Sequence, residues 1–196
     1  MKIENFKPNK SSFLSIEKDM SIIIDSIFSN ETLLKLLYYT SKDALRKPAL
    51  TDEQKMSLID KNIKIKPKVY VDKDVKTYII IRIRNFTPSS NPQFRSCIIE
   101  FDIICHADQW AMEDFKIRPY RIAAELDNML TDKHLSGIGT LDFSGTNDLA
   151  LTDEYCGLCM QFLAYHGDDD KLENVKPQDN PAHVQDFKDV IEDYGY

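Results

Sequence analysis

Residues 77–166 constrain the fold most, because the spacing of their apolar side chains changes along the chain. Residues 77–86 and 94–105 alternate apolar and polar side chains, which predicts two strands of a β-hairpin. Over residues 118–133 the period becomes 3.6, which predicts an amphipathic helix with Pro119 in its first turn. After a glycine-containing turn, residues 140–143 and 155–166 predict two more strands.

The first third of the chain predicts helices. Apolar side chains mostly three and four positions apart indicate a helix over residues 13–28, and Asn30 is placed to cap a second one. Thr51 and Gln54 form a capping-box pattern that opens a short third helix. Residues 63–70 alternate like a strand, but Pro67 has no amide hydrogen and confines them to a sheet edge or an irregular approach.

These elements predict an α+β fold with N-terminal helices and a twisted antiparallel or mixed sheet of about four to five strands, with one helix packed across the sheet. A chain of 196 residues suits one such domain, which we place at residues 13–166 after a flexible arm at residues 1–12. Residues 167–196 hold nine acids and three lysines, or −6 of the formal net charge of −7. We therefore expect an acidic C-terminal extension.

Composition also narrows the classes of partner. No apolar run approaches the roughly 20 residues that cross a bilayer, so we expect no membrane partner. The N-terminal residues lack the apolar segment of a secretory signal, so we expect residence in the cytosol. No basic cluster offers the concentrated positive charge that phosphate contacts need, so we expect no direct nucleic-acid recognition.

The motif Cys156-Gly-Leu-Cys159 has the thiol spacing of redox and zinc sites. On a predicted strand, however, residues three apart point to opposite faces, so we interpret these thiols, with Cys97 and Cys105, as reduced core residues. We expect no cofactor and no metal. The alternative is a small metal- or thiol-dependent enzyme that uses Cys156, Cys159 and His106.

A second polar cluster follows the predicted hairpin and comprises His106, Asp108, Glu113 and Asp114. Because no nucleophile and no second histidine lie nearby, a solvated loop is favoured over a catalytic or metal site.

The candidate interface residues lie on and beside the hairpin. Arg82 and Arg84 share one face of the first strand, and Glu100 and Asp102 share one face of the second. Ion pairs between them would either support the sheet or lie across a subunit boundary, and the sequence does not set their register. Trp110, the only tryptophan, is either a packing anchor or an interface residue.

One stretch carries a resemblance to a known family. The sequence Arg121-Ile-Ala-Ala-Glu-Leu-Asp-Asn-Met-Leu-Thr-Asp-Lys-His-Leu-Ser-Gly-Ile-Gly-Thr-Leu-Asp-Phe follows a hairpin and precedes a strand ending Phe162-Leu-Ala-Tyr165. In this order of elements, residues 13–166 resemble the tail-terminator and head–tail joining proteins of long-tailed bacteriophages. The resemblance implies an N-terminal helix, a twisted sheet with a helix packed across it, no catalytic residues, and assembly into rings that are often hexameric.

The expected function is therefore that of a non-enzymatic virion structural protein, a ring-forming tail terminator at the head–tail junction. Its implied partners are further copies of itself, the tail tube protein and the head–tail connector or neck proteins, with assembly in the host cytoplasm. Residues 31–62 and the acidic extension are longer than a minimal terminator needs. They leave open another neck or tail-completion protein, or an acidic cytosolic protein-binding module.

Overall fold

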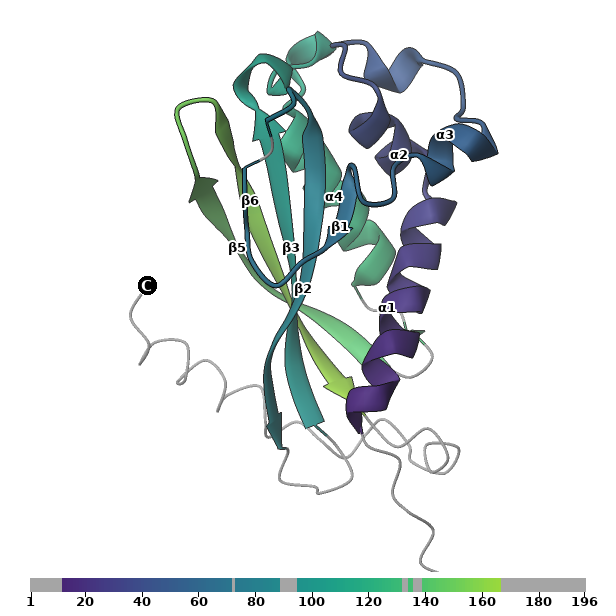
Figure 1. Ribbon diagram of the computed structural model, residues 1–196, viewed down its shortest axis with the longest axis vertical. Helices are drawn as coiled ribbons and strands as arrows, with labels where there is room; N and C mark the ends of the chain where they lie inside the picture. Colours follow the sequence, from purple (N-terminus) through teal and green to yellow (C-terminus); the bar gives the residue numbers. More distant parts are fainter. Residues whose placement is uncertain (1–11, 72, 89–94, 132–133, 136–138, 167–196) are drawn as a thin grey trace, which may run out of the picture.

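The computed structural model describes residues 12–71, 73–88, 95–131, 134–135 and 139–166 (Figure 1). Their strands form a six-stranded mixed sheet in the order β1-β2-β3-β6-β5-β4. The α+β class predicted from the sequence is confirmed. The two outermost strands are only three and two residues long, and they account for the difference from the expected four to five.

The helices begin where the sequence places their caps. The Asn30 side chain accepts a hydrogen bond from the backbone N–H of Leu33 at 3.0 Å, and Thr51 and Gln54 make both hydrogen bonds of a capping box. Pro119 occupies the first turn of its helix, where no amide hydrogen is required. The helices are α1 (Ser12–Ser29), α2 (Glu31–Tyr38), α3 (Asp52–Met56) and α4 (Arg118–Leu130), with short 3-10 turns η1 (Ala44–Arg46), η2 (Ala107–Gln109) and η3 (Glu113–Phe115).

Two long antiparallel hairpins form the body of the sheet. The first hairpin joins β2 (Thr77–Pro88) to β3 (Arg95–His106), and the second joins β5 (Gly139–Ala150) to β6 (Tyr155–His166). Antiparallel pairing of β3 with β6 unites them, while β1 (Ile63–Ile65) lies parallel to β2 and β4 (His134–Leu135) pairs with β5. β1 ends before Pro67, so the rest of the predicted residues 63–70 does not form a strand.

One face of the sheet holds the main core. Helices α1, α2 and α4 all pack on this face, as Figure 1 shows. Burial of about 25 cal/mol for each Å² of apolar surface makes this layer the main source of stability. Its fully buried side chains include Ile23, Ile27, Leu33, Leu36, Ile79, Ile81, Ile99, Phe101, Ile122, Leu126 and Phe162.

The opposite side of the sheet carries no helix of the described residues, and we call it the helix-free face. It has a smaller apolar cluster of Tyr78, Ile80, Ile104 and Tyr155. The chain after β1 crosses in front of it, and Val69 packs against the cluster (Figure 1). The hydroxyl of Tyr78 donates to the Tyr70 carbonyl at 2.7 Å. The N-terminal helices α1 and α2 do not cover this cluster, because they share the face that α4 covers.

The largest departure from the sequence prediction is β5. Residues 140–143 were expected to be a strand, but β5 continues to Ala150, with a register shift between Phe143 and Gly145. The predicted arm lies outside the described residues except for Ser12, which opens α1, and the acidic extension lies wholly outside them. In the described part, no helix combines the length and apolar character of a membrane span.

Candidate functional site

The helix-free face carries a network of buried charges centred on Arg82. The strand register places Arg82 directly opposite Glu100, and Asp102 lies one pair further along the same face. Arg82 Nε lies 2.6 Å from Asp102 Oδ2, and its Nη2 donates to Asp102 Oδ1 at 2.8 Å. The same Nη2 lies 3.0 Å from Glu100 Oε2. One guanidinium therefore joins two carboxylates of the neighbouring strand.

Glu100 extends the network to both sides. Arg84 Nη1 lies 3.2 Å from Glu100 Oε2 and 3.3 Å from Oε1. From the third strand, Gln161 lies opposite Glu100 and donates its side-chain amide to Oε1 at 2.9 Å. The network thus crosses β2, β3 and β6. The predicted pairing of Arg82 and Arg84 with Glu100 and Asp102 is present. The hydrogen bond from Gln161 to Glu100 was not predicted.

The members of the network differ in exposure. Asp102 is fully buried and Glu100 is 3% exposed, but half of the Arg84 side chain meets solvent. Burial raises the pKa of Asp102 above its ordinary value of 3.8, and the Arg82 guanidinium offsets only part of this shift. Although burial opposes the charge on Arg82, Asp102 and Glu100 together raise its pKa. Arg82 therefore keeps its positive charge, whereas burial disfavours the charged form of Asp102.

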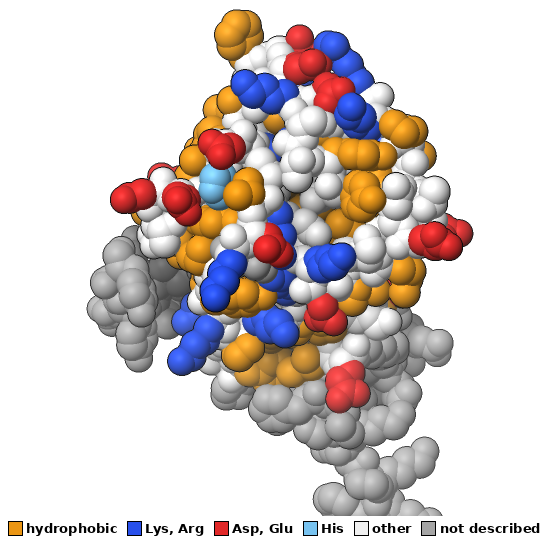
Figure 2. All heavy atoms as spheres, turned by 45° about the horizontal axis from the view of Figure 1, so that its top comes forward, with side chains coloured by type: hydrophobic (Ala, Val, Ile, Leu, Met, Phe, Trp, Pro, Cys, Tyr) orange, Lys and Arg blue, Asp and Glu red, His pale blue; other side chains and the backbone are white. Residues whose placement is uncertain are grey.

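This arrangement is suited to contact with another surface. Two arginines face two carboxylates, so the network is close to neutral, and Arg84 presents its charge at the exposed margin. Figure 2 shows basic and acidic side chains interleaved with hydrophobic ones on the side of the molecule that it presents. Mixed charges of this kind provide register and specificity at an interface more than net affinity.

The Cys156 and Cys159 side chains lie on opposite faces of β6, as the alternation predicts. Cys156 is paired in register with Cys105, and Cys159 with Asp102. Gly157 between them has a packing role, because a Cβ atom there would lie 1.7 Å from the backbone oxygen of Ile103. This glycine lets β3 and β6 approach closely, which is a sufficient reason for its place in the motif.

Burial also makes the thiols poor nucleophiles. It raises the pKa of Cys97 and Cys159 to about 12, that of Cys105 to about 11, and that of Cys156 to a lesser degree. The thiolate is the form that attacks substrates and binds metals. Within the described residues, no group of three or more histidine, cysteine or acidic side chains is arranged to hold a metal ion.

The polar cluster after β3 is divided between two places. His106 is buried, and its Nδ1 accepts a hydrogen bond from the Asp108 N–H at 3.2 Å. Glu113 and Asp114 instead form ion pairs with Arg46, at 2.9 and 3.4 Å. The predicted solvated loop is therefore wrong for His106, which β3 carries into the packed end of the sheet.

Trp110 lies apart from the other candidate interface residues. It is partly buried just after η2, beyond the end of β3, and its carbonyl accepts the Arg118 N–H at 2.9 Å. The structure thus brings together four of the five predicted interface residues and leaves Trp110 at the end of the sheet.

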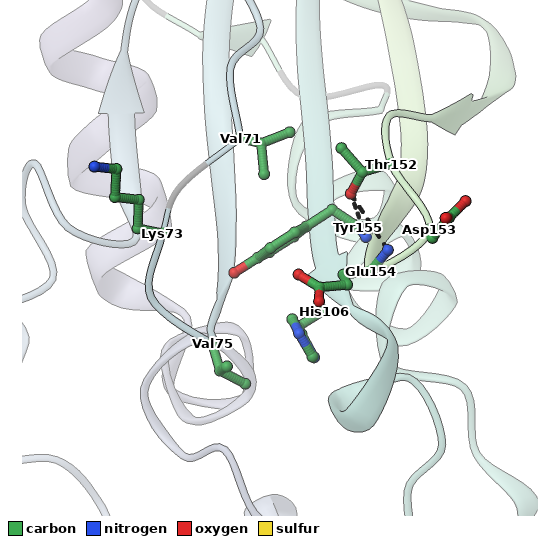
Figure 3. Close-up of a pocket in the computed structure, with 8 residues that line it drawn as sticks. All are labelled: Val71, Lys73, Val75, His106, Thr152, Asp153, Glu154 and Tyr155. Carbon is green, nitrogen blue, oxygen red and sulfur yellow. Dashed lines mark hydrogen bonds between the residues drawn. The ribbon is translucent and has the colours of Figure 1, made fainter.

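A cavity of about 450 Å³ opens beside His106 (Figure 3). The Tyr155 side chain extends across it, and the rings of His106 and Tyr155 meet edge to face with centroids 5.0 Å apart. Val71 and Val75 form apolar walls, while Lys73 and Asp153 extend away from Tyr155 on opposite sides (Figure 3). Thr152 and Glu154 complete the lining.

Sequence reasoning missed Arg118, which is fully buried at the start of α4. It donates five hydrogen bonds to backbone carbonyls at 2.8 to 3.3 Å, and no carboxylate faces it among these partners. Four of those carbonyls belong to α2 and the residues after it, so Arg118 joins α4 to the N-terminal helices. An arginine next to a proline carries no sequence signal for this role.

Comparison with known proteins gives one match and one negative result. A search of curated proteins finds no match to this sequence. The YomW family matches residues 30–164, which include α2, the first hairpin, all but the last two residues of the second, α4 and all members of the charged network. Because this match spans more than half of the chain, the protein belongs to the YomW family.

Proposed function

We propose that this protein is a non-enzymatic structural component of a long-tailed phage virion, a ring-forming tail terminator at the head–tail junction. In this role several copies, six if the usual ring size holds, cap the tail tube and join it to the connector or neck. Assembly takes place in the host cytoplasm, and the partners are the tail tube protein and the neck proteins.

One observation carries the proposal: among the described residues, helices cover one face of the sheet only. The resemblance described above implies an N-terminal helix, a twisted sheet and one helix packed across it. The described residues have this order, with α1 and α4 on the same face of two long hairpins. A ring subunit needs a stable core on one side and a surface for its neighbours on another, and a one-sided sheet supplies both.

The charged network supports the same proposal. It lies on the helix-free face, where no helix of the described part separates it from a neighbouring surface. Arg84 lies at the margin of the network, where half of its side chain is exposed and its guanidinium pairs with Glu100. In a ring, Arg84 could therefore pair with a carboxylate of another subunit in place of Glu100. Charge pairs that repack in this way set the orientation of neighbours in a ring.

The test is the mass of the purified protein in solution, measured by light scattering, alone and mixed with tail tubes, followed by negative-stain imaging. We expect rings, either spontaneous or formed at the end of a tube. A persistent 22.7 kDa monomer that binds neither tubes nor neck components contradicts the proposal. Tubes from an unrelated phage serve as the control for specific capping.

A further inference from the structure

Two of the four cysteines lie directly opposite each other on neighbouring strands. Cys105, near the end of β3, and Cys156, near the start of β6, are partners in the antiparallel register. Register partners point to the same face of a sheet. Here it is the face that the helices cover, because Ile103 and Leu158, two positions along each strand, belong to the main core. The two thiols are therefore neighbours on one face.

The spacing of the two strands suits a disulfide. The Ala107 N–H donates to the Glu154 carbonyl at 2.8 Å, so this pair, two positions further in the same register, is hydrogen-bonded. Bonded and non-bonded pairs alternate along an antiparallel ladder, so Cys105 and Cys156 are also a hydrogen-bonded pair, in which Cα atoms lie about 5.5 Å apart. Disulfides join residues whose Cα atoms are roughly 4.4–6.8 Å apart. The backbone thus already holds both cysteines within the range of a disulfide.

The surroundings of the two thiols differ. Burial raises the pKa of Cys105 to about 11, and the nearby Cys156 adds to this rise, whereas the Thr77 hydroxyl and the charge of Arg118 oppose it. Thr77 Oγ1 lies 3.3 Å from Cys105 Sγ. Cys156 is partly exposed, so it meets an oxidant first. An accessible thiol with a second thiol beside it can close a disulfide after the first has been oxidised.

We propose that Cys105 and Cys156 form a redox site, in which a peroxide converts the two thiols into a disulfide that joins β3 to β6. The Cys156 thiolate attacks one peroxide oxygen and the O–O bond breaks, which leaves a sulfenic acid on Cys156 and, with the thiol proton, one water. The Cys105 sulfur then attacks the Cys156 sulfur, the S–O bond breaks, and the Cys105 proton leaves with the hydroxide as a second water. The peroxide is reduced, and the two thiols are oxidised.

The raised pKa values make the first step slow, because little of either thiol is ionised at neutral pH. The second step joins two register partners within one molecule, so it outruns the attack of a second peroxide on the same sulfur. Such a pair stays reduced in the cytosol, where thiol reductants are in excess, and closes in oxidising surroundings. In the proposed virion role, which only this last sentence assumes, release from the host cell is that change of surroundings.

The disulfide would tie together the two halves of the sheet. The first hairpin meets the second where β3 pairs with β6. A bond between Cys105 and Cys156 also closes a loop that contains α4 and β5. Cross-links that close long loops remove the most conformational freedom from the unfolded chain. We therefore expect oxidation to raise the melting temperature by about 5 °C or more.

The test is titration of the purified protein with hydrogen peroxide, followed by mass spectrometry of the intact chain and of peptides digested without reduction. We expect the mass to fall by two hydrogen atoms and one cross-linked peptide pair to contain Cys105 and Cys156. Thermal denaturation followed by circular dichroism measures the rise in melting temperature. Dithiothreitol should restore both the original mass and the original melting temperature.

Alanine variants of single cysteines provide matched controls. Cys105→Ala and Cys156→Ala should each abolish the disulfide and the rise in melting temperature. Cys97→Ala and Cys159→Ala should retain both, because neither of these residues lies opposite a second cysteine in the register. If a variant does not fold, peptide mapping of the unaltered chain still shows which cysteines are joined.

The outcomes separate this inference from the proposed function. Thiols that stay unmodified, a sulfinic acid on Cys156 without a cross-link, or a cross-link between other cysteines would overturn the redox site. A Cys105–Cys156 bond that leaves the melting temperature unchanged or lowers it would overturn its role in tying the hairpins together. None of these measurements uses tail tubes or rings, so the redox site and the tail role stand or fail independently.

Discussion

Two arginines lie on opposite sides of the sheet, Arg118 fully buried and Arg82 with 12% of its side chain exposed, and their charges are satisfied in different ways. Arg118, beneath the helices, is surrounded by the backbone carbonyls of Leu36, Gln109 and their neighbours. Arg82, on the helix-free face, is paired with carboxylates. The first interaction uses backbone carbonyls, which no side-chain substitution removes, and the second uses side chains, which substitution can change.

The difference also appears in the pKa values of the two arginines. Burial lowers the pKa of Arg118, whose five hydrogen-bond partners are neutral backbone carbonyls and include no carboxylate. The pKa of Arg82 is raised by its acidic partners against the effect of burial. The helix side is thus a fixed junction, whereas the helix-free face is a set of matched charges.

The largest expected effect is the loss of the helix-side junction. Arg118→Met should lower the free energy of unfolding by about 4 kcal/mol, because five buried carbonyls lose a donor at once. Chemical denaturation followed by circular dichroism measures this loss. Arg118→Lys keeps the charge with three donors and should lose less.

The matched control lies one turn along the same helix. Arg121 is partly buried and pairs with Glu125 at 3.9 Å, so Arg121→Met should change stability by no more than about 0.5 kcal/mol. If Arg118→Met lowered the free energy of unfolding by less than about 1 kcal/mol, the five hydrogen bonds from Arg118 to backbone carbonyls would not be what holds α4 to α2.

A double-mutant cycle tests whether apolar residues can replace the Arg82–Asp102 pair on the helix-free face. Asp102→Leu and Arg82→Met should each lower the free energy of unfolding by about 3 kcal/mol, because each leaves a buried charge without its principal partner. The double variant should lose only about 1 kcal/mol, since apolar residues of similar volume replace both charges. Additive losses in the double variant would contradict this expectation. No second substitution can compensate for the loss of Arg118 in this way, because its partners are backbone carbonyls.

The two sides should also respond to acid with opposite signs. Glu31 at the start of α2 accepts the Leu50 N–H at 2.8 Å and pairs with Lys55 at 3.2 Å. Although burial opposes the shift, these contacts hold the pKa of Glu31 below 4.5, whereas burial raises that of Asp102 above 3.8. Folding therefore favours the charged form of Glu31 and the protonated form of Asp102.

Linkage fixes the direction of each effect. The contribution of Glu31 is complete above pH 4.5 and is lost as the pH falls through its folded pKa. The folded protein takes up a proton at Asp102 before the unfolded chain does, so Asp102 adds stability as the pH falls through its folded pKa. Denaturation from pH 7 to pH 3 should show the stability of the wild type falling relative to Glu31→Gln and rising relative to Asp102→Asn. Relative stabilities that change in the same direction would contradict the comparison.

Much of the helix side could be predicted from the sequence, because its signals are local. Asn30, Thr51 and Pro119 act within their own helical turns, and the structure has each in the predicted role. The second half of β5 could not be predicted, since Gly145, Asn147 and Asp148 have low strand propensity. Pairing with β6 overrides that local preference.

The candidate site was only partly predictable for a related reason. Alternation placed Arg82 and Glu100 on strand faces, but a register is a relation between distant segments, and it decided that Gln161 joins them. Arg118 could not be found at all, because its acceptors are backbone carbonyls that leave no trace in side-chain patterns.

The smallest expected effect concerns the exposed margin of the network. Arg84→Glu places a carboxylate beside Glu100 and should lower the free energy of unfolding by about 0.5 kcal/mol, because half of the Arg84 side chain is solvated and its field is screened. The loss should shrink when salt is raised. If Arg84 also meets a neighbouring subunit, its reversal should weaken ring formation far more than folding, as light scattering at matched salt would show. A variant that folds and assembles like the wild type would contradict both the supporting role of this arginine and its role at a subunit boundary.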